Sequence, residues 1–327
     1  MTLDPAAIFD RPRPAPTPGR PFQPFPEPYL SGPIIAHWTG KTAAALVARL
    51  ARVSPEEAAV LVEFGSFWLD DRPCLEPEKN LAGHRHFRFN PPSYGPLKFY
   101  EADPGRIVYE DAELLVYNKE SGRPSQAVPH DAHNNTLAAL NRLIRARGDQ
   151  PALWLVHRLD ADTSGLLLMA KAKEAAGKLG QAFQEGRVAK KYLALGLGAA
   201  PEREKFTIEA PLAKEGRRYV VRPQGPGLSA RTEFQALSAA DWGSPKGLKQ
   251  VLFQARPLTG RTHQIRLHLA WAGWPIVGDR FYGRREIEEE SPAPRLMLAS
   301  AALSFLHPRS EQMIEISLFT GTCSAGK

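Results

Sequence analysis

The stretch HRLDADTSGLLLMA, residues 157–170, places a polar loop directly before an apolar run. Residues 154–156 (WLV) are also apolar, so the pattern predicts two buried strands joined by the loop 157–165. The loop carries two carboxylates, a histidine, an arginine and two hydroxyls. A loop between core strands can hold a reactive group on a rigid frame. We therefore expect a reactive site in this loop.

The segments around this loop indicate the fold class. Residues 107–119 read as a strand, an acidic turn and a strand, and 192–195 as a further strand. Helical spacing is seen over 134–147 and 173–185. Short strands separated by turns or helices, without strict βαβ alternation, favour an α+β domain with a mostly antiparallel sheet.

Two further polar islands interrupt the apolar strands. Residues 186–192 (GRVAKKY) are basic and end on Tyr192, a combination that suits phosphate contact and base stacking. Residues 258–268 (LTGRTHQIRLH) predict the start of a helix, with Thr262 as the expected N-cap and Gly273 near the helix end.

On that helix His263 and Arg266 are three residues apart and are expected to share a face. A helix N-terminus with these side chains and free backbone amides suits anions. Solvated loop polarity would explain any one of the islands. Three islands rich in Arg, His and Asp, each beside apolar strands, favour a functional site.

The islands carry a family resemblance. HRLDxxTSGLLL at 157–168, KxY at 190–192 and TGRTHQIRLH at 259–268 resemble the signature motifs of the RluA-type RNA pseudouridine synthases. The stretch 275–283 (PIVGDRFYG) is similar to the family's sequence after the third motif. The resemblance covers roughly residues 103–310.

Two positions depart from the family pattern. Family members usually read Lys-Pro-x-Gly where residues 119–122 read KESG, and Leu-His-Ala where 298–300 read LAS. Neither departure removes a residue to which the resemblance gives a chemical role. They bear on the identity of the substrate more than on activity.

The resemblance implies a pseudouridine synthase fold, with a curved, mostly antiparallel sheet and flanking helices. It implies that uridine in RNA is isomerised to its carbon-linked form without a cofactor or a metal. Asp160 is the expected nucleophile, Arg266 its ion-pair partner, and Tyr192 the residue that stacks on the uracil and aids proton removal from carbon 5. Asp162 is the rival carboxylate. Whether the carboxylate attacks the sugar or the base stays open.

RNA is the expected partner, either ribosomal or transfer RNA. A target uracil must be unpaired or flipped out of a helix before it can react. Four side chains are the candidates for holding RNA near that nucleotide: Arg158, Thr163, Arg261 and His263. Each of them has a simpler alternative role in satisfying backbone groups of the loops.

The first part of the chain differs in composition. Residues 1–34 form a proline-rich segment that predicts an extended arm. Residues 35–95 predict a small α+β domain, with helices over 41–50 and 54–62, that resembles a degenerate copy of an RNA-binding domain found in RNA-modifying enzymes. Acidic side chains on its second helix leave RNA binding by this domain open. The catalytic domain is expected over 103–320.

Bulk composition sets outer limits. The 327 residues carry 42 Lys and Arg against 35 Asp and Glu, and a net charge of +7 attracts polyanions such as RNA. Two cysteines far apart, no long apolar run and no secretory pattern at the start predict a cytoplasmic protein that binds no membrane. A monomer is expected. The HRH at 84–86 fits a strand with one polar face better than a metal site.

Two alternatives remain. A catalytically silent RNA-binding or ribosome-assembly factor on the same fold would keep the positive charge but would not need Asp160, Tyr192 and Arg266 together. A glycoside hydrolase using Asp160 and Asp162 is disfavoured, because carboxylates two residues apart on a loop rarely stand about 5–9 Å apart across a sugar.

Overall fold

The computed structural model describes residues 29–92, 99–148, 152–216, 218–240, 248–283, 293, 295–318 and 323–325. Most of the expected proline-rich arm, residues 1–28, lies outside them. The described residues divide into two compact units. The N-terminal unit contains the described residues up to 102 together with 124–148, and the sheet unit contains the rest.

The N-terminal unit is a small α+β fold. Its antiparallel sheet has four strands in the order β1 (Leu30–Pro33), β4 (His86–Phe89), β2 (Phe67–Leu69), β3 (Arg72–Pro73). Its helices are η1 (Ala36–Trp38), α2 (Ala43–Ala51), α3 (Pro55–Glu63) and α4 (Thr136–Ala146). One core cluster joins α2 and α3 to the sheet.

Local sequence signals explain where these helices begin. Ser54 and Glu57 form a capping box in which each side chain accepts a hydrogen bond from the other residue's amide, and Pro55 takes the first helical position. The two helices predicted for this region are confirmed. Residues 124–148, which the sequence assigned to the catalytic domain, group with this unit. A catalytic domain over 103–320 therefore stays a prediction.

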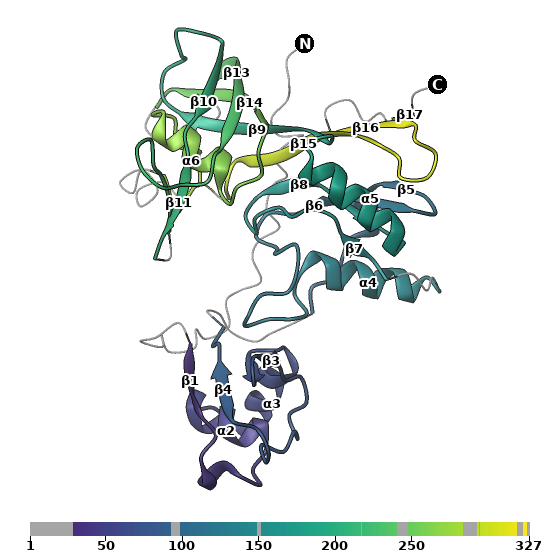
Figure 1. The fold of residues 1–327 in the computed structure, drawn as a ribbon, viewed down its shortest axis with the longest axis vertical. Helices are drawn as coiled ribbons and strands as arrows, with labels where there is room; N and C mark the ends of the chain where they lie inside the picture. The colour runs from purple at the N-terminus through teal and green to yellow at the C-terminus, as the bar shows by residue number, and fades with distance from the viewer. Residues whose placement is uncertain are drawn as a thin grey trace. The chain divides into compact units, whose positions relative to one another are not determined.

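The sheet unit is built on eleven strands (Figure 1). A path of eight runs β10 (Lys205–Glu209), β13 (Arg231–Ala240), β14 (Gln250–Pro257), β9 (Ala189–Leu197), β15 (Leu298–Leu306), β8 (Ser164–Ala170), β6 (Leu114–Lys119), β5 (Ile107–Glu110). Three strands lie off this path: β7 (Trp154–Leu155), β16 (Met313–Ser317) and β17 (Cys323–Ala325). A separate hairpin joins β11 (Leu212–Glu215) to β12 (Arg218–Val221).

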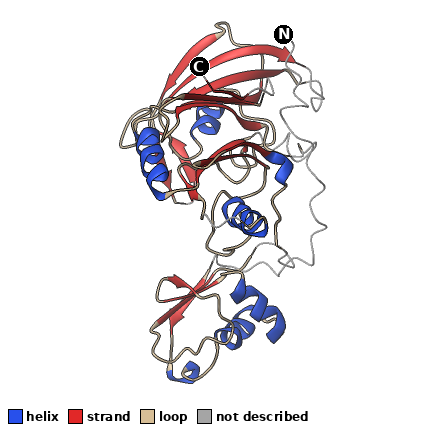
Figure 2. Ribbon diagram, turned by 90° about the vertical axis from the view of Figure 1, so that its right-hand side faces the viewer, coloured by secondary structure: helices blue, strands red, loops and turns tan. Residues whose placement is uncertain are grey.

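Among the described strands of the sheet unit, all pairings are antiparallel except that between β15 and β8. Strands dominate this unit and helices are few (Figure 2). The unit has three described helices: η2 (Pro104–Arg106), α5 (Lys173–Gln184) and α6 (Gln264–Trp271). The predicted α+β class with a mostly antiparallel sheet is confirmed.

Strand β8 fixes the end of the predicted reactive loop. All seven of its residues are buried, and α5 lies over the strand (Figure 1). Gly165 has φ +103°, and a Cβ there would overlap the backbone of Ser300 on β15. Only glycine permits this approach of the two strands. The loop therefore enters the centre of the sheet at a fixed point.

Helix α6 supplies the opposite wall of the site. The predicted helix end is confirmed, because Gly273 follows the last turn with φ +93°. The prediction that Thr262 caps the helix is wrong. His263 takes the N-cap position in the left-handed region, at φ 56°, without a side-chain capping bond. Its imidazole is engaged elsewhere, with Tyr282.

Candidate active site

Asp160 lies in the middle of the loop before β8, with about a third of its side chain exposed (32%). The loop turns tightly at this point, since the amide of Thr163 donates to the Asp160 carbonyl at 3.1 Å. Thr163 is buried. A carboxylate held on a short turn, partly open to solvent, is placed to meet a substrate atom.

A second loop, residues 119–122, is hydrogen-bonded to the Asp160 loop. The amide of Gly122 donates to the Ala161 carbonyl at 2.9 Å, and the Ser121 hydroxyl donates to the Asp162 carbonyl at 2.6 Å. The fully buried Lys119 ammonium donates to three backbone carbonyls, those of Glu120, Arg123 and Ala161, at 2.7, 2.8 and 3.0 Å. These bonds fix the carbonyls of the two residues that follow Asp160.

Arg266, on the first turn of α6, stands opposite Asp160. Its Nη1 lies 3.9 Å from Asp160 Oδ2. Its Nε and Nη2 donate to the two carboxylate oxygens of Asp279 at 2.8 and 2.7 Å. The side chains of Arg266 and Asp279 are 2% and 0% exposed. The expected pairing of Arg266 with Asp160 is present, but the shorter, bidentate pair is with Asp279.

The charge of Arg266 is secured by these neighbours. Burial alone would lower the pKa of the guanidinium, but the hydrogen bonds and charge of Asp279, with the charges of Asp160 and Asp162, raise it. Asp279 Oδ1 also accepts the amides of Phe281 and Tyr282 at 3.0 and 3.1 Å. The Asp279 carboxylate thus binds both Arg266 on α6 and the backbone that follows Asp279.

His263 links this segment to the reactive loop. Its Nδ1 lies 2.7 Å from the Tyr282 hydroxyl, and its Nε2 lies 3.9 Å from Asp160 Oδ2. Burial lowers the pKa of His263, against the opposing effect of the Asp160 charge. A neutral imidazole beside the carboxylate at neutral pH follows. The left-handed backbone at His263 is a conformation that non-glycine residues adopt where the surroundings demand it.

Tyr192 projects from β9 opposite Ser300 of β15 and is buried. Burial, and then the negative charge of Asp160, raises the pKa of the Tyr192 phenol above its usual range. The phenol is therefore protonated at neutral pH. The three residues predicted to carry the chemistry, Asp160, Tyr192 and Arg266, thus interact in one place.

The remaining predicted residues fall into two groups. Thr163 and His263 lie at the site, as described. Arg158 is exposed, and Arg261 is exposed with its Nε donating to the Ser229 carbonyl at 3.0 Å. His157 turns away from the chemistry: its Nε2 accepts the Leu168 amide at 3.0 Å.

Three residues of the site were missed from the sequence: Lys119, Asp279 and Tyr282. Two of them lie in the stretch 275–283, which matched the family pattern without a role for any residue. Lys119 begins the KESG segment, which drew attention only for its missing proline. A Lys or Asp that is buried needs a partner of opposite charge or a set of hydrogen bonds. The apolar residues around Lys119 and Asp279 could therefore have indicated that both belong to a structured site.

Residues 113–271 match the family model described as RNA pseudouridylate synthase. This part of the chain is similar to the RNA pseudouridylate synthases. It is 38% identical over 213 residues to ribosomal large subunit pseudouridine synthase C of Vibrio cholerae serotype O1, and 36% identical over 218 residues to the protein of that name from Escherichia coli K12. These matches cover 64% of this chain and 64% and 65% of the relatives, so the chain spans just under two-thirds of their length.

Two solved structures of human proteins with pseudouridylate synthase domains agree with the fold. Human RNA pseudouridylate synthase domain containing 1 is 28% identical and superposes with a TM-score of 0.54, over 67% of this chain and 85% of that one. Human RNA pseudouridylate synthase domain containing 4 is 22% identical with a TM-score of 0.52, over 68% and 88% of the chains, and supports the fold alone. The predicted pseudouridine synthase fold is confirmed.

The described part of the chain contains no group of three or more His, Cys, Asp or Glu side chains able to hold a metal ion. Within the same residues, no helix is long and apolar enough to cross a membrane. His84, from the HRH segment, instead places its Nδ1 2.8 Å from Asp70.

Proposed function

We propose that this protein isomerises uridine in RNA to pseudouridine, with Asp160 as the nucleophile. The proposal rests on how Asp160, Arg266 and Tyr192 are arranged. The carboxylate of Asp160 is partly exposed, and the buried guanidinium of Arg266 lies 3.9 Å from it. The phenol of Tyr192 is buried, and the charge of Asp160 raises its pKa. A silent RNA-binding protein would have no use for a buried cation kept beside a partly exposed carboxylate.

The reaction needs no external reagent. The bond between nitrogen 1 of uracil and carbon 1′ of the ribose breaks, the detached base turns, and carbon 5 forms the new bond to carbon 1′. The proton on carbon 5 then leaves, and nitrogen 1 ends with a proton, so the product is an isomer of the substrate. A carboxylate can hold either the sugar or the base during this exchange.

Arg266 is positioned to interact with the Asp160 carboxylate. A guanidinium held by two hydrogen bonds to Asp279 cannot swing away, so its remaining Nη1 stays directed at Asp160. This keeps a positive charge 3.9 Å from the Asp160 carboxylate. Arg266 can therefore hold that carboxylate in place while it reacts.

Tyr192 provides a face for the uracil and a route for the proton. Because the phenol is protonated at rest, it can take the carbon 5 proton only by passing its own proton to a neighbouring acceptor. Asp160 is the charged acceptor whose field acts on it. A relay of this kind needs the phenol and the carboxylate together.

The substrate we propose is ribosomal RNA of the large subunit, since relatives 36–38% identical carry that substrate in their names. The net charge of +7 supports a polyanionic partner. The N-terminal unit is proposed to assist RNA binding through cations such as Arg49 and Arg52 at the end of α2. Glu56 and Glu57 at the start of α3 limit how close phosphates can come to that helix.

The test is release of tritium from ribosomal RNA that carries tritium at carbon 5 of uracil. Wild type should release it, Asp160→Asn should not, and Asp162→Asn serves as the matched control that should retain release. No release by wild type from any cellular RNA pool would refute the proposed function. Full activity of Asp160→Asn would leave the function but remove Asp160 from its role. Comparing modified positions in RNA from a deletion strain then identifies the uridine.

A further inference from the structure

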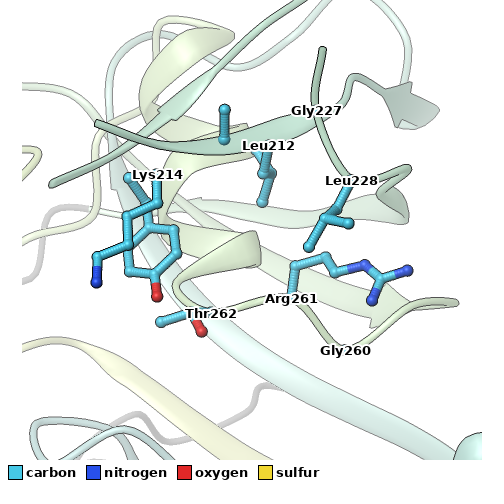
Figure 3. A pocket seen from close by; sticks show the side chains of 9 residues that line it. Leu212, Lys214, Gly227, Leu228, Gly260, Arg261 and Thr262 are labelled. Carbon is cyan, nitrogen blue, oxygen red and sulfur yellow. The ribbon is translucent and has the colours of Figure 1, made fainter. Parts of the chain in front are cut away.

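A pocket opens near the start of α6, where the β11–β12 hairpin faces the turn that leads into that helix (Figure 3). Its wall comes from three segments: the hairpin, residues 227–228 and residues 260–262. Its volume is about 590 Å³. That size lies within the usual range for small-ligand sites, about 300–1,000 Å³.

One part of the lining is apolar and includes an aromatic ring. Leu212 is buried, Tyr219 is half-buried, and Leu228 is 62% exposed although its side chain is large and apolar. The loop that carries Leu228 is fixed, because Leu212 and Leu228 exchange both backbone hydrogen bonds at 3.0 and 2.8 Å. An apolar surface of this kind, open to solvent but rigid, suits the flat face of a base.

The other part is cationic. Lys214 and Arg261 are exposed and stand on opposite sides of the pocket (Figure 3). Arg261 is anchored: its Nε donates to Ser229 and its amide donates to Gln264 Oε1 at 3.0 Å. None of the side chains that line the pocket, all within the described part of the chain, is acidic. Two cations around an apolar floor fit a ligand with both a base and phosphates.

One residue of the pocket wall is the chain neighbour of a residue of the candidate active site. Thr262 lines the pocket, and the next residue is His263, whose Nε2 lies 3.9 Å from Asp160. The Tyr219 ring packs edge-on against the His263 ring, with centroids 5.7 Å apart. The His263 ring therefore contacts Tyr219 of the pocket wall on one side and approaches Asp160 on the other.

We propose that this pocket holds the nucleotide next to the target uridine in the same RNA strand. Tyr219 and the two leucines contact its base, while Lys214 and Arg261 contact the flanking phosphates. This inference rests on the proposed function, because the target uridine sits at Asp160. It assigns to the β11–β12 hairpin the role of binding the base beside the one that reacts.

The experiment uses the full-length protein and a short RNA that contains the uridine mapped above. Three altered RNAs lack a single base: the 5′ neighbour of the target, its 3′ neighbour, or a base several positions away as a control. Single-turnover tritium release is measured for each, together with affinity by fluorescence anisotropy. The affinity measurement does not depend on turnover.

With wild type, removing one of the two neighbouring bases should reduce affinity by about tenfold or more, while the distant base matters little. With Tyr219→Ala, the same removal should change affinity by less than about threefold, because the stacking partner is already gone. Tyr219→Phe keeps the ring and should behave as wild type. Lys214→Ala should lower the slope of log affinity against log salt by roughly 0.7, and Lys173→Ala, an exposed lysine on α5, should not.

Two outcomes would overturn the proposal. In one, neither neighbouring base matters to wild type. In the other, the loss persists unchanged in Tyr219→Ala, which would place that base elsewhere. Absence of tritium release by wild type on the intact RNA refutes the proposed function instead. The anisotropy results then still decide whether the pocket contacts a base.

Discussion

Asp279→Asn tests whether the buried carboxylate positions the arginine that faces Asp160. The substitution keeps the shape of the side chain and removes its charge. The Asp279 oxygen that accepts Arg266 Nη2 also accepts two backbone amides, so an asparagine oxygen is expected to remain there. The asparagine NH2 then faces Arg266 Nε, and one charge-assisted hydrogen bond is replaced by two opposed donors.

The magnitude follows from burial. A hydrogen bond to a charged group contributes about 1.5–3 kcal/mol, and removing one partner of a buried ion pair costs about 3–5 kcal/mol. Asp160 at 3.9 Å offsets part of the uncompensated charge, so we expect a loss of about 3 kcal/mol in the free energy of unfolding. For a unit of this size the melting temperature should fall by about 6–12 °C.

Catalysis should suffer separately from stability. With Arg266 no longer held from behind, kcat should fall by about 100-fold, which corresponds to about 2.7 kcal/mol of barrier. KM for RNA should change by less than about threefold, because the Asp279 side chain has no exposed surface with which to touch RNA. Thermal melts and single-turnover tritium release measure the two effects.

A double variant separates positioning from simple folding. Arg266→Met with Asp279→Leu replaces the ion pair by apolar side chains, a change that often restores stability. We expect the melting temperature to recover while activity stays lost. The reasoning is refuted if Asp279→Asn keeps kcat within about threefold of wild type with an unchanged melting temperature, or if the double variant regains activity.

Three further predictions follow from the described contacts. Tyr192→Phe removes the proton route but keeps the ring, so kcat should fall by at least about 100-fold with little change in KM; normal kcat in a tritium release assay would exclude the relay. Burial, and the charge of Lys190, lower the pKa of His157 to about 3 in the folded protein. Between pH 3 and about 6.5 the imidazole is therefore protonated in the unfolded protein but not in the folded one. The free energy of unfolding should therefore decrease as pH falls through that window, by up to about 1.4 kcal/mol per pH unit, and urea denaturation of His157→Gln should show a flatter response. Gly165→Ala should lower stability by about 3 kcal/mol because its Cβ meets Ser300; Gly177→Ala in α5, where a Cβ meets nothing within 4 Å, should raise it slightly in the same thermal melt.

Local signals in the sequence were sufficient for the elements that depend on near neighbours. The α3 cap at Ser54, the β5–β6 hairpin and the end of α6 at Gly273 are each specified within a few residues. The pairing of β15 with β8 joins Ala299 to Ser164, more than a hundred residues apart, and no local pattern contains that information. The sheet order therefore needed the structure.

The same distinction applies to the site. Asp160, Tyr192 and Arg266 were identified because each lies in a motif that resembles a family's signature. Asp279 lies 13 residues after Arg266 and pairs with it only because the chain turns back after α6. The Thr262 prediction was wrong for a related reason. His263 contacts Tyr282, which follows much later in the chain, and His263 takes the N-cap position with a left-handed backbone in place of Thr262.

Lys119 connects the loop 119–122 to the Asp160 loop although the proline of the family pattern is absent. A proline after this lysine would stiffen the loop 119–122 by fixing its backbone. Here Glu120 follows instead, and the Lys119 ammonium uses its three donors on the carbonyls of Glu120, Arg123 and Ala161, the last beside Asp160. Burial lowers the pKa of Lys119 to about 7, against the opposing charges of Glu120, Asp162 and Asp160. The charges of Asp160 and Asp162 thus favour the charged form of the lysine that holds their own loop.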